Sequence, residues 1–233
     1  MRVREPRATV VLTEYHRPEN MSTLLAALAL QSEPVKIIYI NNSGRLVPYS
    51  NLPVNGAFYV AMPSNGGCFP RLLMSVYATT PYVIWWADDF IPTTGLAVES
   101  LVTSAAQNPN VITGLQGHGL NKVEPYYDKA DNATGNVPII KGNILAFRRS
   151  LLSNVSLDYM GDDPEYRLRC DDLHLSLELG EGLPVHIADE ELERHFLEIG
   201  PPVGLCNETG HYAIRNAFCR EWLQHGWGGE NAN

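Results

Sequence analysis

The chain is short of charge and of long apolar runs, and each shortage excludes a class of protein. Only 18% of its 233 residues are charged and the formal net charge is -9, so broad nucleic-acid binding through neutralised phosphates is not expected. No stretch approaches the roughly 20 consecutive apolar residues of a membrane span, and residues 1–7 lack the apolar core of a signal peptide. The sequence therefore predicts a soluble, cytoplasmic protein without a membrane span.

Cysteines are also few, and they are widely separated. The four are Cys68, Cys170, Cys206 and Cys219, and no two have the close spacing of a structural zinc site. Scattered cysteines in a chain without a secretion signal are expected to be buried thiols. Apolar residues, by contrast, make up 45% of the chain. With no internal repeat, this composition suits one compact domain over residues 1–233.

Short apolar runs alternate with helical spacing in the first part of the chain. Strands are expected at residues 8–12, 35–40, 57–61 and 83–86, and helices at 18–30 and 70–77. Pro18 and Pro70 stand where each helix would begin. Strands that alternate with helices predict an α/β domain with a mostly parallel central sheet and helices on both faces.

The second part mixes shorter strands with polar loops. We expect strands at 111–114, 144–147 and 184–188, helices at 95–107, 171–179 and 212–223, and irregular loops at 116–137 and 158–169. The Gly-rich residues 226–233 predict a flexible tail.

The expected strand at 83–86 stops just before two carboxylates, Asp88 and Asp89. Open α/β sheets bind ligands at the carboxyl ends of their strands, and the turn-forming residues 91–95 could bring both side chains to one site. A hard divalent cation that also contacts substrate phosphates is commonly held by one or two carboxylates. The pair therefore predicts a metal site, although a solvated turn or a helix cap also explains two adjacent aspartates.

Polar residues follow the other early strands as well. They are Thr13, Glu14 and Arg17 after the first strand, Asn42 after the second, and Asn65, Gly66 and Arg71 after the third. Because the carboxyl ends of parallel strands share one edge, we expect these residues to converge on one crevice. A glycine there permits close approach of the backbone to a ligand, and an arginine could meet a phosphate. Ordinary loop polarity, an Asn-Ser-Gly turn and a surface arginine are the alternatives.

Two further acidic pairs occur late in the chain. Asp171 and Asp172 open an expected helix, so capping explains one of them and leaves the other free to act. Asp162 and Asp163 form a competing pair in a polar loop, where solvation or contact with an acceptor is expected.

Taken in order, these clusters resemble the GT-A fold of nucleotide-sugar glycosyltransferases, particularly the family 2 type. The resemblance runs from Thr9 to about Ala188. Its elements are Thr-Glu, Asn-Asn-Ser, Asn-Gly-Gly with a nearby arginine, Asp-Asp, Gly-Asn at 142–143 and Asp-Asp-Leu at 171–173. It implies a single GT-A domain in which residues 8–114, approximately, bind the nucleotide sugar and residues 115–225 bind the acceptor.

The resemblance implies that Asp89, with Asp88, holds Mn²⁺ or Mg²⁺ against the nucleotide diphosphate. Such an ion neutralises the leaving phosphates. Asp88 would lie nearer the ribose or the metal. The chain departs from the family at Ala87, where many members have a first acidic residue, and this puts the ribose contact in doubt.

Some members of the family supply a late histidine as a further metal ligand. His211 is the preferred candidate because it would share a helical face with Arg215, from which both could close over the diphosphate. His186 and His195 are two further candidates, and a structural role is the alternative for all three.

The nucleotide-binding residues that the resemblance implies are Thr13, Glu14, Arg17, Asn42, Asn65, Gly66, Arg71 and Asp88. An inverting enzyme also needs a general base that takes the proton from the acceptor hydroxyl as it attacks the anomeric carbon. In the family this base belongs to a late acidic motif, which implies Asp172, with Asp171 as a near-equal candidate.

The sequence thus predicts a metal-dependent glycosyltransferase that moves a sugar from a nucleoside-diphosphate sugar, with a UDP-sugar favoured, to a hydroxyl acceptor with inversion. A sugar-nucleotide nucleotidyltransferase is the alternative enzyme, but residues 13–17 lack the glycine-rich loop of that class. Ala87 gives some support to a non-catalytic binding module. The default acceptor is a glycan, contacted by the loop at 116–137 with its Tyr126 and Tyr127. A protein or a small molecule could serve instead, and DNA is less expected because the chain is acidic.

Overall fold

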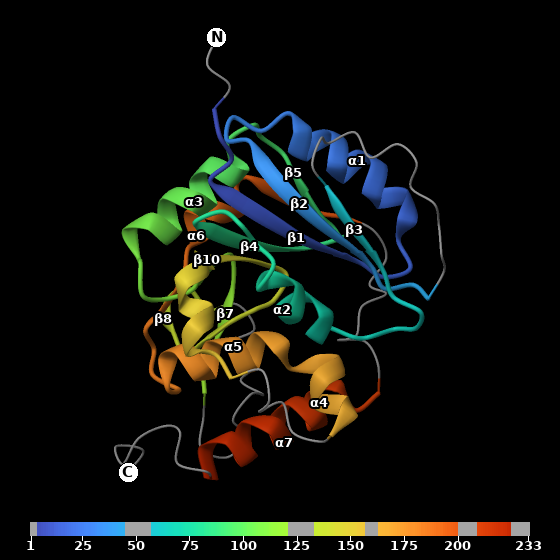
Figure 1. The fold of residues 1–233 in the computed structure, drawn as a ribbon. Coiled ribbons are helices and arrows are strands. Elements are labelled where there is room, and N and C mark those ends of the chain that lie inside the picture. The colour runs from blue at the N-terminus through green and yellow to red at the C-terminus, as the bar shows by residue number, and fades with distance from the viewer. Residues whose placement is uncertain (1–3, 45–56, 121–132, 157–162, 200–208, 225–233) are drawn as a thin grey trace.

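The apolar runs of the sequence form a twisted eight-stranded sheet that crosses the molecule (Figure 1). The computed structural model describes residues 4–44, 57–120, 133–156, 163–199 and 209–224. The order of strands is β3-β2-β1-β4-β10-β6-β11-β8. Their bounds are β1 Ala8–Glu14, β2 Val35–Asn41, β3 Phe58–Ala61, β4 Tyr82–Ala87, β6 Thr113–Gly114, β8 Gly135–Val137, β10 Ile144–Arg148 and β11 His186–Ala188.

The first four of these strands in the chain run parallel to one another. Glu14 at the end of β1 pairs in register with Asn41 of β2, and Thr13 pairs with Ala87 of β4. Strand β10 lies antiparallel to both β4 and β6, and β11 is parallel to β6. The sheet is therefore mostly parallel, as predicted, and the residues that follow β1, β2 and β4 gather at one edge.

Helices cover both faces of this sheet. They are α1 (Pro18–Ala29), α2 (Phe69–Ser75), α3 (Ala97–Gln107), α4 (Pro164–Arg169), α5 (Asp171–Gly180), α6 (Glu190–Glu193) and α7 (His211–Gln224), with a 3-10 helix at Arg149–Asn154. Figure 1 shows α1 and α3 on one side of the sheet and α2 and α5 on the other.

Alternation along the strands divides the core between the two faces. Trp86 packs with the residues of α1 and α3, whereas its neighbour Trp85 packs with those of α2 and α5. Both indole rings are fully buried, so this pair belongs to the core. Each ring satisfies its N–H group, Trp85 on Ser75 Oγ at 2.7 Å and Trp86 on the Phe90 carbonyl at 2.7 Å.

Two short ribbons complete the β-structure. Strand β5 (Phe90–Pro92) pairs antiparallel with β12 (Phe196–Glu198), and β7 (Gly117–His118) pairs antiparallel with β9 (Ile139–Ile140). The pairing of β5 with β12 joins the residues directly after Asp88–Asp89 to a segment more than 100 positions later in the chain. It therefore brings the late part of the chain to the edge where the early polar residues lie.

The prediction of an irregular loop at 158–169 was wrong for its second part, which forms α4. Asp163 caps this helix, because its Oδ1 accepts the Glu165 N–H at 2.8 Å, and Pro164 follows at the first helical position. Arg169 and Glu165 add an i,i+4 ion pair of 2.9 Å. Capping is thus the observed role of Asp163, while Asp162 lies outside the described residues.

Other sequence predictions also fall outside the described residues, namely Cys206, Tyr126, Tyr127 and the tail at 226–233. The remaining three cysteines are free thiols, with Cys170 and Cys219 buried and Cys68 half-buried. Over the described ranges, no helix combines the length and the apolar character needed to cross a bilayer.

Candidate active site

A cavity of about 540 Å³ opens at the carboxyl edge of β1, β2 and β4. Ten of the residues predicted from sequence line it: Thr13, Arg17, Asn42, Asn65, Arg71, Asp88, Asp89, Asp171, Asp172 and His211. Glu14 and Gly66 lie behind this surface. The Glu14 carboxylate accepts a 3.2 Å hydrogen bond from Tyr39 Oη, and the Gly66 N–H donates to Asn42 Oδ1 at 2.8 Å.

Asp88 organises the loop that follows β1. Its Oδ2 accepts the Tyr15 N–H at 2.7 Å, and its Oδ1 accepts Arg17 Nη1 at 2.6 Å. Between these two donors, His16 adopts a left-handed conformation with φ of 61°, which is uncommon for a residue with a side chain. Burial raises the pKa of Asp88 to about 6, although both donors oppose this. The contacts of Asp88 thus define the shape of the Tyr15–Arg17 loop.

Asp89 lines the same cavity and has one carboxylate oxygen without a partner among the described residues. Its Oδ2 lies 3.1 Å from Arg17 Nη1. Its Oδ1 is buried and has no hydrogen-bond partner among the described residues. A buried carboxylate oxygen without a donor is energetically costly unless a ligand satisfies it. Of the two adjacent aspartates, Asp89 is therefore the one with a coordination position to offer.

His211, at the start of α7, offers a second position. Its Nδ1 is likewise buried without a partner in the described part of the chain. Burial lowers the pKa of His211 to about 4, and the nearby Arg215 contributes to this lowering, so the imidazole is neutral and able to bind a metal at neutral pH. No group of three or more His, Cys, Asp or Glu side chains in the described ranges forms a complete metal site. A Mg²⁺ or Mn²⁺ ion held by Asp89 and His211 would take its remaining ligands from phosphate and water.

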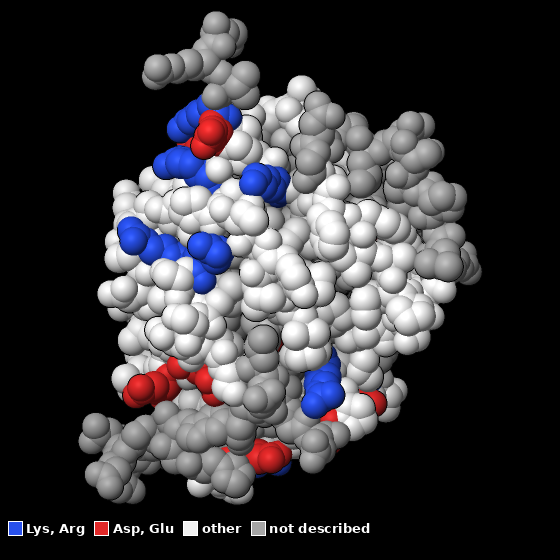
Figure 2. Space-filling view, viewed as in Figure 1, with Lys and Arg blue, Asp and Glu red and all other residues white. Residues whose placement is uncertain are grey.

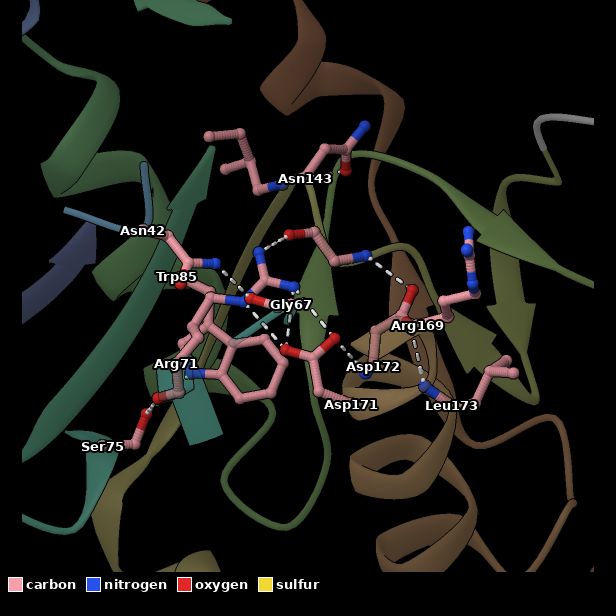
Figure 3. A network of polar contacts seen from close by, with 12 residues as sticks. Asn42, Gly67, Arg71, Ser75, Trp85, Asn143, Arg169, Asp171, Asp172 and Leu173 are labelled. Atoms are coloured by element: carbon pink, nitrogen blue, oxygen red, sulfur yellow. Dashed lines mark hydrogen bonds and ion pairs between the residues drawn. The ribbon is translucent and has the colours of Figure 1, made fainter. Parts of the chain in front are cut away.

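Asn42 holds the glycine turn that follows β3 (Figure 3). Its Nδ2 donates to the Gly67 carbonyl at 2.7 Å and to Asn65 Oδ1 at 3.0 Å. Gly67 has φ of +65°, and a Cβ at this position would lie 2.3 Å from Leu168 Cα. Only glycine fits here, because the turn is left-handed and packs directly against the end of α4. Asn42 thus shapes the cavity wall, whether or not it also contacts a ligand.

Arg71 is an almost fully buried residue of the cavity lining. Its Nε and Nη2 donate to the two carboxylate oxygens of Asp171 at 3.0 and 3.1 Å, and its guanidinium stacks 4.6 Å from the Trp85 ring. Nη1 donates to the Gly142 carbonyl. Figure 3 shows this network from Asn42 to Asp172. Contact between Arg71 and a phosphate stays a prediction.

Asp172 is surrounded by donors as well. Arg215 Nη1 and Nη2 reach its two oxygens at 2.9 Å each, and the N–H groups of Gly142 and Leu173 donate at 3.0 and 2.9 Å. Burial alone would raise the pKa of Asp172, but Arg215 holds it below its ordinary value. The predicted base is therefore ionised at neutral pH, and each of its oxygens already accepts two hydrogen bonds.

His186 and His195 lie outside the cavity lining. His186 is buried between Ile112 N, which donates to its Nδ1, and the Ser176 carbonyl. His195 lies between the hydroxyls of Thr94 and Ser100, at 2.7 and 3.1 Å. Both ring environments are those of structural histidines.

Several lining residues were not predicted from the sequence: Lys141, Arg169, Glu198 and Tyr212. Gln116 and His118 also line the cavity, and they belong to the loop at 116–137 that was expected to contact the acceptor. Lys141 adjoins the Gly142–Asn143 pair, so its neighbourhood could have indicated it. Glu198 stands in a three-residue strand with no periodic pattern. Its place in the cavity follows from the pairing of β12 with β5, which local sequence does not encode.

No protein-family model and no curated protein sequence matches the chain. Solved structures do match. The mannosyltransferase PcManGT from Pyrobaculum calidifontis, in complex with GDP-Man and Mn²⁺, is 19% identical over 70% of this chain and 51% of its own, with a TM-score of 0.49. TarS from S. aureus is 14% identical over 97% of this chain and 44% of its own, with a TM-score of 0.57.

A shorter TarS structure, residues 1–349 in complex with UDP-GlcNAc, is 12% identical over 89% of this chain and 64% of its own, with a TM-score of 0.60. The chain thus spans less than two thirds of the length of each of these proteins. At such low identity, the two TarS matches show the fold alone. The chain has the GT-A fold of the nucleotide-sugar glycosyltransferases.

Proposed function

We propose that the chain is a metal-dependent glycosyltransferase, which moves a sugar from a nucleoside-diphosphate sugar to a hydroxyl acceptor. The observation that carries this proposal is the buried, unpartnered Oδ1 of Asp89, on a residue that lines the cavity at the carboxyl edge of a GT-A sheet. TarS, which shares the fold, has been solved with UDP-GlcNAc. This supports a nucleotide sugar, and a UDP-sugar in particular, as the donor.

The donor half of the site is formed by the ends of β1, β2 and β3. Thr13 and Asn65 both line the cavity, and Thr13 Oγ1 is buried without a partner among the described residues. We assign these side chains to the base and ribose, and Arg17 to the diphosphate. Three further predicted residues would shape the cavity wall and not contact the donor directly, because their hydrogen bonds are to other residues of the protein. They are Glu14, Asn42 and Gly66.

A Mn²⁺ or Mg²⁺ ion held by Asp89, with His211 as a further ligand, would neutralise the charge of the leaving diphosphate. Asp88 lies beside this site and would act by holding Arg17 and the Tyr15 backbone in place. Arg17 contacts both carboxylates. Asp88 and Asp89 Oδ2 would hold its guanidinium beside the metal position at Asp89 Oδ1, where it would contact the diphosphate.

Acceptor activation is assigned to Asp172. Asp171 is fully buried and both of its oxygens are taken by Arg71, whereas Asp172 keeps 5% of its surface exposed at the cavity. To take the acceptor proton, Asp172 would exchange one hydrogen bond from Arg215 for the acceptor hydroxyl. Direct attack on the anomeric carbon from this side, with departure of the nucleoside diphosphate, inverts the configuration of the sugar.

The acceptor would lie against the later half of the chain, where Gln116, Lys141 and Asn143 line the cavity. A glycan hydroxyl is the acceptor class that we favour. The described residues on the face shown in Figure 2 carry scattered charges and no continuous basic surface, and the net charge is -9. A DNA acceptor is accordingly less favoured, because its phosphates would meet little compensating charge.

A screen of nucleotide sugars tests the proposal. The protein is incubated with UDP-, GDP-, CDP- and dTDP-sugars, with Mn²⁺ or Mg²⁺, and release of the nucleoside diphosphate is measured with and without chelator. Metal-dependent release from at least one donor is expected. Pyrophosphate formation from a sugar phosphate and a nucleoside triphosphate would instead favour nucleotidyl transfer. Absence of release from every nucleotide sugar would overturn the assignment and favour a non-catalytic module.

A further inference from the structure

Glu198 is placed beside the acidic pair by backbone pairing. In the β5–β12 ribbon its Cα lies opposite Phe90, the residue that follows Asp89. The next residue, Ile199, donates its N–H to the Asp89 carbonyl at 2.7 Å. The base of the Glu198 side chain is thus held at a defined position next to the candidate metal ligand, and the residue lines the cavity.

Glu198 differs from the other carboxylates of the cavity. The others, Asp88, Asp89, Asp171 and Asp172, are each in contact with an arginine. Glu198 is exposed, and its side chain makes no hydrogen bond or ion pair with any of the described residues. A carboxylate that neither stabilises the fold nor neutralises a neighbour is available to a ligand.

The chemistry of that ligand follows from charge. An ionised carboxylate only accepts hydrogen bonds, at two oxygens with about four lone-pair positions. A phosphate oxygen at this place would bring two negative charges together beside Asp89, which is unfavourable. Hydroxyl groups of a sugar are uncharged donors, and two adjacent hydroxyls can bind both oxygens of one carboxylate.

We propose that Glu198 binds the hydroxyl groups of a substrate sugar and thereby selects which sugar the enzyme uses. This inference rests on the proposed function. The hydroxyls belong either to the sugar of the donor or to the acceptor, and both sources present the same chemistry to Glu198. In either case Glu198 acts on the sugar, and the nucleoside diphosphate is bound without it.

The test compares Glu198→Gln with the wild-type protein, in the presence of Mn²⁺. Affinities for UDP, UDP-GlcNAc, GDP and GDP-mannose are measured by calorimetry, and transfer is measured with a panel of methyl hexosides and glycerol as acceptors. The matched control is Glu193→Gln, an exposed glutamate on α6 that does not line the cavity. The control should bind and transfer as the wild type does.

For Glu198→Gln, affinity for the free nucleoside diphosphate should stay within about twofold of wild type. If the donor sugar is the ligand, affinity for the nucleotide sugar should fall about tenfold or more, as expected when a hydrogen bond to a charged group is weakened. If the acceptor is the ligand, its KM should rise about tenfold instead while the donor affinity is unchanged. Either result supports the proposal.

Wild-type values for donor affinity and transfer in Glu198→Gln would overturn the assignment of Glu198 and leave the proposed function intact. An equal loss of affinity for UDP and UDP-GlcNAc would also overturn it, because Glu198 would then act on the metal or the diphosphate. Failure of the wild-type protein itself to bind any of the four nucleotides would overturn both proposals together.

Discussion

Arg215 holds Asp172 with two hydrogen bonds of 2.9 Å each, from a helix 43 residues further along the chain. Both side chains are almost fully buried, since their exposed fractions are 5% and 7%. The pair ties the last described helix to the start of α5, directly beneath the cavity. Removal of Arg215 alone leaves the charge of Asp172 uncompensated in the interior. This costs far more than the loss of a surface ion pair.

Arg215→Ala is therefore expected to lower the free energy of unfolding by about 3–5 kcal/mol, the typical cost of breaking a buried pair from one side. The matched control is Arg194→Ala, which removes an exposed pair with Glu191 at 2.7 Å and should cost less than about 1 kcal/mol. Urea unfolding of both variants measures the difference. Equal effects would show that burial does not set the strength of the Arg215 contact.

Gly67→Ala tests the turn that Asn42 supports. A left-handed alanine costs about 1–2 kcal/mol at any site, and at Gly67 the new Cβ would also lie 2.3 Å from Leu168 Cα. Gly135 is the control, with φ of +81° and nothing within 4 Å of the Cβ that alanine would add. Thermal unfolding should show a larger loss for Gly67→Ala than for Gly135→Ala. A similar loss of stability in both variants would mean that the turn at Gly67 accommodates the new Cβ by a small backbone shift.

His118 provides a pH-dependent prediction. Burial, followed by repulsion from Lys141, lowers the pKa of its imidazole to about 3 in the folded protein, against about 6.5 when unfolded. Between these values the unfolded chain binds a proton that the folded protein does not. Stability should therefore fall as pH falls below about 6.5, by about 2 kcal/mol per such group between pH 7 and pH 5.

Urea unfolding of the wild type and of His118→Asn at pH 7 and pH 5 measures the contribution of His118 to the pH dependence of stability. The variant should lose less stability between the two pH values than the wild type does. Other buried histidines contribute equally to both proteins, so they cancel. An identical pH dependence would show that His118 becomes protonated without unfolding.

The parts of the fold that the sequence predicts are those with local signals. β1, β2 and β4 are short β-branched and aromatic runs buried on both faces, and this pattern is typical of strands inside a parallel sheet. The register of these strands then brings Thr13, Asn42 and Asp88 to one edge. Convergence of the early polar residues is thus a consequence of strand order, and it could be predicted.

The contacts inside the site could not be predicted in the same way. Arg71 and Asp171 are 100 residues apart, and neither shows from its neighbours that it pairs with the other instead of with a ligand. Glu198 reaches the cavity only through the pairing of β12 with β5. Helix α4 is six residues long and has too few apolar positions for a periodic signal. Only the capping residue Asp163, followed by Pro164, indicates in the sequence that a helix begins there.

Asp88 and Asp89 are adjacent in sequence but should respond differently to the same substitution. Asp88→Asn weakens the hydrogen bonds that Asp88 accepts from Arg17 and from the Tyr15 N–H. It should therefore lower the stability of the protein and its affinity for the nucleotide sugar, while the requirement for Mn²⁺ remains. Asp89→Asn weakens one contact of Arg17 but should keep the fold, because Arg17 retains its shorter ion pair with Asp88 and Asp89 Oδ1 has no partner to lose among the described residues. Unfolding curves and donor titrations with and without chelator separate the two effects.

Binding of nucleoside diphosphates to the wild type and to Asp89→Asn, titrated by calorimetry with Mn²⁺ and with chelator, tests the central claim most directly. UDP, GDP, CDP and dTDP serve as probes, so the result does not depend on the donor sugar. The wild type should bind at least one of them much more tightly with Mn²⁺, and the variant should show no effect of Mn²⁺. Full Mn²⁺ dependence in Asp89→Asn, or no binding by the wild type, would contradict a metal-assisted glycosyl transfer at this cavity.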